Sequence, residues 1–259
     1  MKTRFVHGPS KINRKQMALK YVVNLGLLIL FVACTGQETS DYTVEAIRTP
    51  SPPVIDGIED DPIWQQITPV VLKENRTGNE TRNVAIRTQV KSCYDDQTLY
   101  FFFLCNDPDI WTSFTQRDEH LWENEAVELF IDVDDEPETY VEIEVSPANV
   151  LFDSYIVDTL NIDVPETALF NLEGIRTAVE VSGTLNERND KDDHWTVEIA
   201  IPLADLGNEN IPQVTTATEM RINFYRLDEN QGKERMYYAW SPTVDRFHKP
   251  ASFGRLIFK

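Results

Sequence analysis

The sequence predicts an all-β protein: an antiparallel β-sandwich of the jelly-roll or immunoglobulin-like kind with one or two short helical turns. Many short runs of β-branched and aromatic residues are separated by Gly, Pro, Asn and Asp, a spacing typical of sandwiches and barrels. Within one run, Phe101, Phe102 and Phe103 follow one another. That strand must be buried on both faces, which requires a second layer over the sheet.

The size and charge of the chain limit its class and its partners. It has 259 residues, of which 41% are hydrophobic, and a formal net charge of −19. This is enough for one large β domain or two small ones with a buried core. Nucleic acid and anionic membrane surfaces would be repelled, so a neutral or cationic partner fits better.

Residues 1–34 have the pattern of a bacterial lipoprotein signal peptide. Basic residues precede an apolar run, residues 21–33, which is too short to span a membrane comfortably and leads into Cys34. The small Ala33 directly before this cysteine resembles a lipobox, in which the cysteine is lipidated and becomes the new N-terminus. The segment starting at Met17 is a complete signal by itself, which favours a later start of translation.

The mature protein is therefore expected to be secreted across the inner membrane and held in the cell envelope, periplasmic or on the cell surface, by its lipid alone. Loss of residues 1–34 removes six basic residues and no acid, which leaves a net charge of about −25. Residues 35–51 are mostly polar and are expected to form a tether leading into an edge strand, TVEAI. Residues 52–259 are expected to form the sandwich.

The sandwich is predicted to begin with a short helical turn and a hairpin. Asp61 as cap, followed by Pro62, predicts about one turn over residues 63–67 that buries Trp64. Two strand-like runs, VAIRTQVKSC and TLYFFFLCND, flank a YDDQ turn and predict a hairpin at the centre of a sheet.

Two cysteines, Cys93 and Cys105, lie in the two arms of this hairpin. They are out of register by several residues, too far apart for a disulfide bond. We therefore expect both to be buried free thiols.

Two later segments place acidic residues on one face of a sheet. In residues 126–133 side chains alternate between the two faces of the strand, and Glu128 lies on the face opposite Val127, Leu129, Ile131 and Val133. In residues 140–145, Glu142 and Glu144 likewise lie on the face opposite the apolar side chains of their strand. If the two strands pair, these carboxylates line one sheet face. They could accept sugar hydroxyls, bind calcium, form a catalytic pair, or simply be a solvated acidic face.

Further strand-like runs continue to the C-terminus without an internal repeat or a dividing linker; they are VLFDSYIV, GIRTAVEVSG, HWTVEIAIP, MRINFYRLD, RMYYAW and SFGRLIF. Residues 202–206, followed by Gly207, predict a second short helical turn. The long loops 161–171 and 208–218 are placed to lean over one end of the sandwich.

Trp122 and Phe247 are the candidates for gripping a sugar, because both lie in polar loops and not within strands. An aromatic ring can lie against the C–H face of a pyranose while nearby side chains accept its hydroxyls. A tryptophan simply packed under a loop is the alternative. The histidines lack the spacing of a zinc site, and P-loop, dinucleotide and GxSxG motifs do not occur.

The order of four motifs resembles that of the family 9 carbohydrate-binding modules; the motifs are PVIDGIEDDPIW, YDDQTLYFFFLCNDP, WENEAVELFID and PASFGRLIF. Together they span nearly the whole mature chain. The resemblance implies an antiparallel β-sandwich that binds a polysaccharide or oligosaccharide without cleaving it, and often bound calcium. Asp107 and Glu125 fall in loop regions where the family places calcium ligands.

The resemblance also assigns roles to the candidate sugar-binding residues. Trp122 and Phe247 stand where family members have two tryptophans that clamp a terminal sugar, and Glu128 matches a sugar-binding acid. Glu144 stands where the family has an arginine. This departure implies either a ligand other than glucose or cellobiose or a loss of sugar binding.

The function that the sequence favours is non-catalytic carbohydrate binding by a secreted, lipid-anchored sandwich that serves polysaccharide breakdown or uptake. One alternative is a glycoside hydrolase that uses the acids of the same sheet face. A second alternative is a haem-binding relative of the sandwich, in which methionine together with lysine or histidine would ligate iron. Met220 and Met236 are available for that role.

Overall fold

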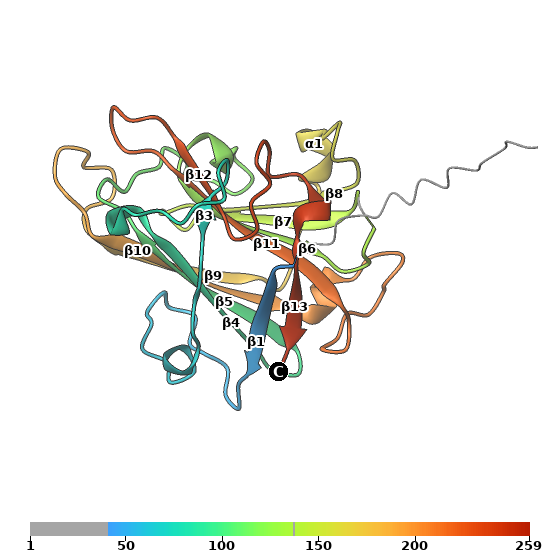
Figure 1. Cartoon of the computed structure of the whole chain (residues 1–259). Helices are drawn as coiled ribbons and strands as arrows, with labels where there is room; N and C mark the ends of the chain where they lie inside the picture. The colour runs from blue at the N-terminus through green and yellow to red at the C-terminus, as the bar shows by residue number, and fades with distance from the viewer. Residues whose placement is uncertain (1–40, 137) are drawn as a thin grey trace, which may run out of the picture. The chain divides into compact units, whose positions relative to one another are not determined.

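The computed structural model describes residues 41–136 and 138–259, whose regular structure is nearly all β-strand (Figure 1). The predicted all-β class is confirmed. In chain order the strands are β1 (Thr43–Arg48), β2 (Val70–Val71), β3 (Lys73–Glu74), β4 (Thr88–Tyr94), β5 (Thr98–Asn106), β6 (Ala126–Asp132), β7 (Tyr140–Val145), β8 (Leu151–Ile156), β9 (Arg176–Ser182), β10 (His194–Pro202), β11 (Met220–Asp228), β12 (Met236–Ala239) and β13 (Gly254–Phe258).

The strands form two sheets that are joined through β1. The order along the hydrogen-bonded path is β8-β7-β6-β11-β13-β1-β4-β5-β10-β9, while β12 pairs with β11 and β3, and β2 pairs with β4. Most neighbouring strands are antiparallel, but β1 runs parallel to both β13 and β4. The result is a nearly closed sheet, and the expectation of a wholly antiparallel sandwich is corrected at this strand.

Strand β1 passes from one sheet to the other. Its first four residues, 43–46, pair with residues 255–258 of β13, which lies beside it in Figure 1. Its last two residues pair with Cys93 and Tyr94 of β4. The sequence analysis placed this segment at a sheet edge, within the polar stretch 35–51. That expectation is wrong, because alternate side chains of β1 are buried in the core and both backbone edges are paired.

The core between the sheets explains the run of phenylalanines in β5. Phe101 and Phe103 point inward and meet Phe224 of the opposite sheet edge-on, with ring centroids 5.6 and 5.9 Å apart. Phe102 points to the other side, where Trp64 covers it at 5.7 Å. The predicted burial of this strand on both faces is confirmed.

The predicted hairpin is present as β4 and β5. Cys93 lies opposite Tyr100 and Cys105 lies opposite Thr88, so the two cysteines are far out of register. Both are buried free thiols, as expected.

The short helical segments of the described chain are η1 (Trp64–Gln66), η2 (Val84–Ile86), η3 (Leu121–Glu123), α1 (Val164–Thr167), η4 (Leu203–Leu206) and η5 (Pro250–Ser252). Two of them, η1 and η4, are the predicted turns. The Asp61 side chain does not cap η1, because its carboxylate accepts a hydrogen bond from the Val54 amide instead. None of the helices among the described residues has the length and apolar character needed to cross a membrane.

Candidate functional site

A cavity of about 950 Å³ lies on the face of the β8-β7-β6-β11 sheet that is turned away from the core. Residues of β6, β7 and β8 line one part of it, and β12 together with the loop 244–248 lines another. Residues of the loop 161–171, including α1, also contribute. The loop 161–171 therefore lies beside the cavity, whereas the loop 208–218, expected to lean over the same end of the sandwich, contributes none of the described residues that line it.

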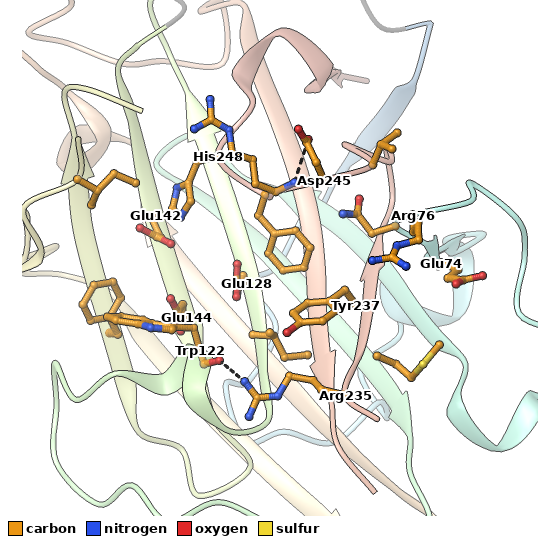
Figure 2. A pocket seen from close by; sticks show the side chains of 18 of the residues that line it. Glu74, Arg76, Trp122, Glu128, Glu142, Glu144, Arg235, Tyr237, Asp245 and His248 are labelled. Carbon is orange, nitrogen blue, oxygen red and sulfur yellow. Dashed lines mark hydrogen bonds between the residues drawn. The ribbon is translucent and has the colours of Figure 1, made fainter. Parts of the chain in front are cut away.

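The floor of the cavity is acidic because β6 and β7 pair in the expected register. Glu128 lies directly opposite Glu144, and Glu142 lies opposite Phe130, which puts all three acids on one face. A carboxylate oxygen from each acid lies within 4.8 Å of the other two. Figure 2 shows the three side chains gathered at the cavity floor. All three are buried, so the solvated acidic face considered above is excluded.

Burial raises the pKa values of these carboxyls. The pKa of Glu142 rises to about 7 through desolvation, although the Ser154 hydroxyl donates to it at 2.9 Å and opposes the shift. Desolvation and the charge of Glu142 raise the pKa of Glu128 well above its ordinary value. Desolvation and the two neighbouring acids do the same for Glu144, against a smaller effect of the Trp122 backbone amide. The Trp122 amide lies near this carboxylate but outside hydrogen-bond geometry, so neither carboxylate oxygen of Glu144 has a hydrogen-bond partner in the described chain.

Trp122 borders this acidic floor. It lies in η3 and is half-buried, and one face of its ring stacks on His120 with centroids 4.5 Å apart and an interplanar angle of 18°. The ring also forms a T-shaped pair with Phe152, with centroids 5.2 Å apart and an interplanar angle of 78°. The indole is thus held in place by neighbouring rings while it lines the cavity.

Phe247 lines the same cavity from the loop before β13. It is half-buried and stacks on Tyr225, with centroids 4.1 Å apart and an interplanar angle of 20°. Tyr237 of β12 meets it edge-on at 5.9 Å. The fold therefore brings together the two aromatic residues that the sequence analysis selected, and each is supported by another ring.

The residues selected as metal ligands also lie close together, at a second acidic cluster. Asp107 and Glu125 are fully buried, and each has an oxygen within 4.8 Å of the other and of an oxygen of Asp228. The buried Arg226 donates to Asp107 at 2.7 Å and to Asp228 at 3.2 Å. One oxygen of Asp228, Oδ2, has no partner among the described residues. Three carboxylates with an unpaired oxygen fit a hard cation such as calcium, although the arginine already neutralises part of their charge.

Comparison with known proteins decides the family. A family model described as carbohydrate family 9 binding domain-like matches residues 55–259. This chain belongs to the carbohydrate family 9 binding domain-like family. Members of the family are non-catalytic binding modules.

Solved structures of family 9 modules share the fold of this domain. A module from Caldicellulosiruptor kristjanssonii in complex with cellotriose has a TM-score of 0.59 at 17% identity, covering 84% of this chain and 94% of its own. The structure of that organism's module with glucose has a TM-score of 0.58 at 18% identity, covering 84% and 96%. A putative carbohydrate-binding protein from Bacteroides uniformis has a TM-score of 0.61 at 15% identity, covering 84% and 99%.

A curated relative extends the likeness to a fungus. A protein of Arthroderma benhamiae named "Extracellular protein" is 28% identical over 181 residues, which cover 66% of this chain and 78% of the relative.

Several residues of the family 9 pocket were not found from the sequence. Arg235 donates to the Trp122 carbonyl at 2.9 Å and pairs with Glu229 at 2.6 Å, so it fixes η3 beside the cavity (Figure 2). The His248 ring bonds to the Tyr140 hydroxyl at 2.6 Å, and burial lowers its pKa to about 4. Because these contacts join distant parts of the chain, no local pattern indicated them.

Two further sequence expectations have different outcomes. Met220 begins β11, whereas Met236 lies opposite Asp228 at the other end of the same strand. Nine residues of extended strand separate these positions, so one haem iron could take only one of the two methionines, together with a lysine or histidine. Cys34, the predicted lipidation site, lies outside the described residues.

Proposed function

We propose that this chain binds a polysaccharide or oligosaccharide without cleaving it, in the cavity lined by Trp122 and Phe247. One observation carries the proposal. These two aromatic residues are far apart in the sequence, yet they line the same cavity, whose floor holds three buried carboxylates. The family supports carbohydrate as the ligand class, and the family 9 modules from Caldicellulosiruptor kristjanssonii were solved in complex with cellotriose and with glucose. The cavity has the size of typical small-ligand pockets.

Each part of the cavity has a chemical role in this proposal. The supported rings of Trp122 and Phe247 offer flat apolar surfaces to the C–H face of a sugar. Glu128, Glu142 and Glu144 accept hydrogen bonds from polar groups of the ligand. We infer that binding of this kind serves polysaccharide breakdown or uptake by partner proteins.

A panel of immobilised glycans tests this function. We expect at least one class of immobilised glycan to retain the protein. Chromatography of a soluble oligosaccharide of that class, after incubation with the protein, should show that it has not been shortened. Shortened products that disappear in a Glu128→Gln variant would indicate a glycoside hydrolase instead. No retention by any member of a broad panel would refute carbohydrate binding.

We propose calcium as a structural ion at the cluster of Asp107, Glu125 and Asp228. A bound ion would stabilise the native state by mass action, so EDTA should lower the melting temperature by about 5–10 °C. Differential scanning calorimetry with EDTA, followed by excess calcium, measures this effect. If calcium no longer raises the melting temperature of an Asp228→Asn variant, the ion is located at this cluster. If neither EDTA nor calcium changes the melting temperature of the wild type, the proposed calcium site is refuted.

We propose that the protein is anchored in the bacterial cell envelope through a lipid on Cys34. The motivating pattern is the basic segment and apolar run that end at this cysteine. Mass spectrometry of the purified protein should find an acylated N-terminal Cys34, and Cys34→Ser should shift the protein from the membrane fraction to the soluble fraction. An unmodified N-terminus at another residue would contradict the anchor.

A further inference from the structure

We propose that the cavity selects a cationic sugar, with the protonated amine of an amino sugar seated among Glu128, Glu142 and Glu144. This inference rests on the proposed carbohydrate-binding function and names its ligand class. It follows from the charge, the spacing and the surroundings of the three acids.

The first step is the missing counter-charge. Six of the described residues that line the cavity are acidic and three are arginines. No salt bridge in the described chain joins Glu128, Glu142 or Glu144 to a basic side chain. Without a counter-charge, burial favours the protonated forms of the three acids, and a ligand that carries positive charge would stabilise their carboxylate forms.

Two of the three arginines that line the cavity, and its histidine, are directed to other partners; the third arginine, Arg76, forms no salt bridge with the three acids. Arg235 is paired with Glu229 and with backbone carbonyls of η3. The exposed Arg246 donates to the Thr159 carbonyl at 3.1 Å. His248, bonded to a tyrosine hydroxyl, is kept neutral at ordinary pH because burial lowers its pKa to about 4.

The second step is the geometry of the acceptors. An ammonium group has three N–H donors, and three acceptors placed tetrahedrally around it at about 2.8 Å are about 4.6 Å apart. The three carboxylates offer oxygens that are at most 4.8 Å from one another. Glu144, only 1% exposed, has both oxygens unpaired and lines the cavity. The number and the spacing of the acceptors thus match an amine.

The third step compares an amine with a metal ion. Calcium takes six to eight oxygen ligands. Two of the three acids lie beside aromatic residues in the sheet, since Phe152 lies opposite Glu144 and Tyr225 lies opposite Glu128, while Ser154 lies opposite Glu142. Rings around an acidic floor suit the C–H face of a sugar and the charge of its ammonium group.

The charge of the whole chain favours the same ligand class. A formal net charge of −19 steers cationic polymers toward the protein and repels anionic ones. A polymer of amino sugars combines the pyranose rings that the aromatics accommodate with one positive charge for each residue.

Three β-1,4-linked trisaccharides test the inference: those of glucosamine, N-acetylglucosamine and glucose. They differ only in the group at C2 of each sugar ring, which is an amine, an acetamide or a hydroxyl. Isothermal titration at about pH 7 should give an affinity for the glucosamine trimer at least about tenfold higher than for the other two, and this preference should weaken with salt. Glu144→Gln and Glu128→Gln should each reduce the preference by about tenfold. Both replacements relieve buried charge, so both variants should fold, which a melting curve verifies.

Glu180→Gln is the matched control, because this exposed acid on β9 carries the same charge and does not line the cavity. It should leave the preference unchanged. Equal or tighter binding of the glucose trimer would overturn the amine while leaving carbohydrate binding intact, whereas failure with every glycan would refute the underlying function. Calcium binding that is lost in Glu144→Gln would assign the cluster to a metal and also overturn the amine.

Discussion

Replacing Arg226 with methionine is expected to destabilise the protein by about 3–5 kcal/mol. The guanidinium is completely buried on β11 and forms ion pairs with Asp107 at 2.7 Å and Asp228 at 3.2 Å. Desolvation opposes its charge, yet Asp228 and Asp107 hold the pKa of Arg226 above its usual value. In calcium-free buffer, methionine would fill the space and leave Asp107, Glu125 and Asp228 buried without a counter-charge. Urea unfolding of the wild type and the variant measures the loss.

The pH dependence of the Arg226→Met variant separates this electrostatic effect from a packing effect. Burial already raises the pKa values of Glu125 and Asp228 in the folded state, and without the arginine they would rise further above those in the unfolded state. The folded variant then binds more protons, so its stability should recover as the pH falls toward about 5. Arg226→Lys, which keeps a charge but not the forked geometry, should lose less than methionine. A loss below about 1 kcal/mol, or one independent of pH, would show that the ion pairs matter little.

Trp64→Ala is expected to cost about 3–5 kcal/mol of stability without changing sugar binding by the folded fraction. The side chain is completely buried under η1, packs on Phe102, and donates from Nε1 to the Glu198 carboxylate at 2.8 Å. Removal of the indole leaves a cavity and deprives the Glu198 carboxylate of one hydrogen-bond donor. The backbone amides of Asp56 and Gly57 still donate to that carboxylate.

Trp64→Phe provides the comparison, since it keeps much of the volume and loses only the N–H donor. We expect this variant to lose about 1–2 kcal/mol in thermal or urea unfolding. Equal losses for alanine and phenylalanine would indicate that the hydrogen bond to Glu198, and not packing, dominates at this site.

The acidic floor of the cavity could be predicted because it follows from a local rule. Side chains alternate along a strand, so Glu128 on one segment and Glu142 and Glu144 on the next share a face whenever the two strands pair. Their burial could not be predicted in this way. It depends on η3 and on the loops that cover the sheet, and those positions are set by long-range contacts such as that of Arg235 with the Trp122 carbonyl.

The second acidic cluster shows the same limit. Asp107 and Glu125 were selected through family resemblance, but their third neighbour, Asp228, was not. One signal was present in the sequence: Arg226 and Asp228 occupy the same face of a strand whose nine residues are all buried. Charged residues at alternate positions of a buried strand require partners, and a search for those partners would have led to Asp107.

The placement of β1 had no comparable signal. Parallel pairing with β13 joins residues near the two ends of the described chain, and parallel ladders such as those with β13 and β4 leave no turn motif between the paired strands. The polar residues around this strand therefore suggested an edge.

The central claim is that Trp122 and Phe247 form a sugar-binding surface, and titration calorimetry of single alanine variants with a retained glycan tests it most directly. Both rings line the cavity and are only half-buried. We expect Trp122→Ala and Phe247→Ala each to weaken binding by about 1–3 kcal/mol, which is about 5–150-fold, while melting temperatures stay within about 5 °C of the wild type. Phe258→Ala, at a half-buried ring outside the cavity, should leave the affinity unchanged. Unchanged affinity in both cavity variants, or unfolding caused by Trp122→Ala, would contradict the proposed site.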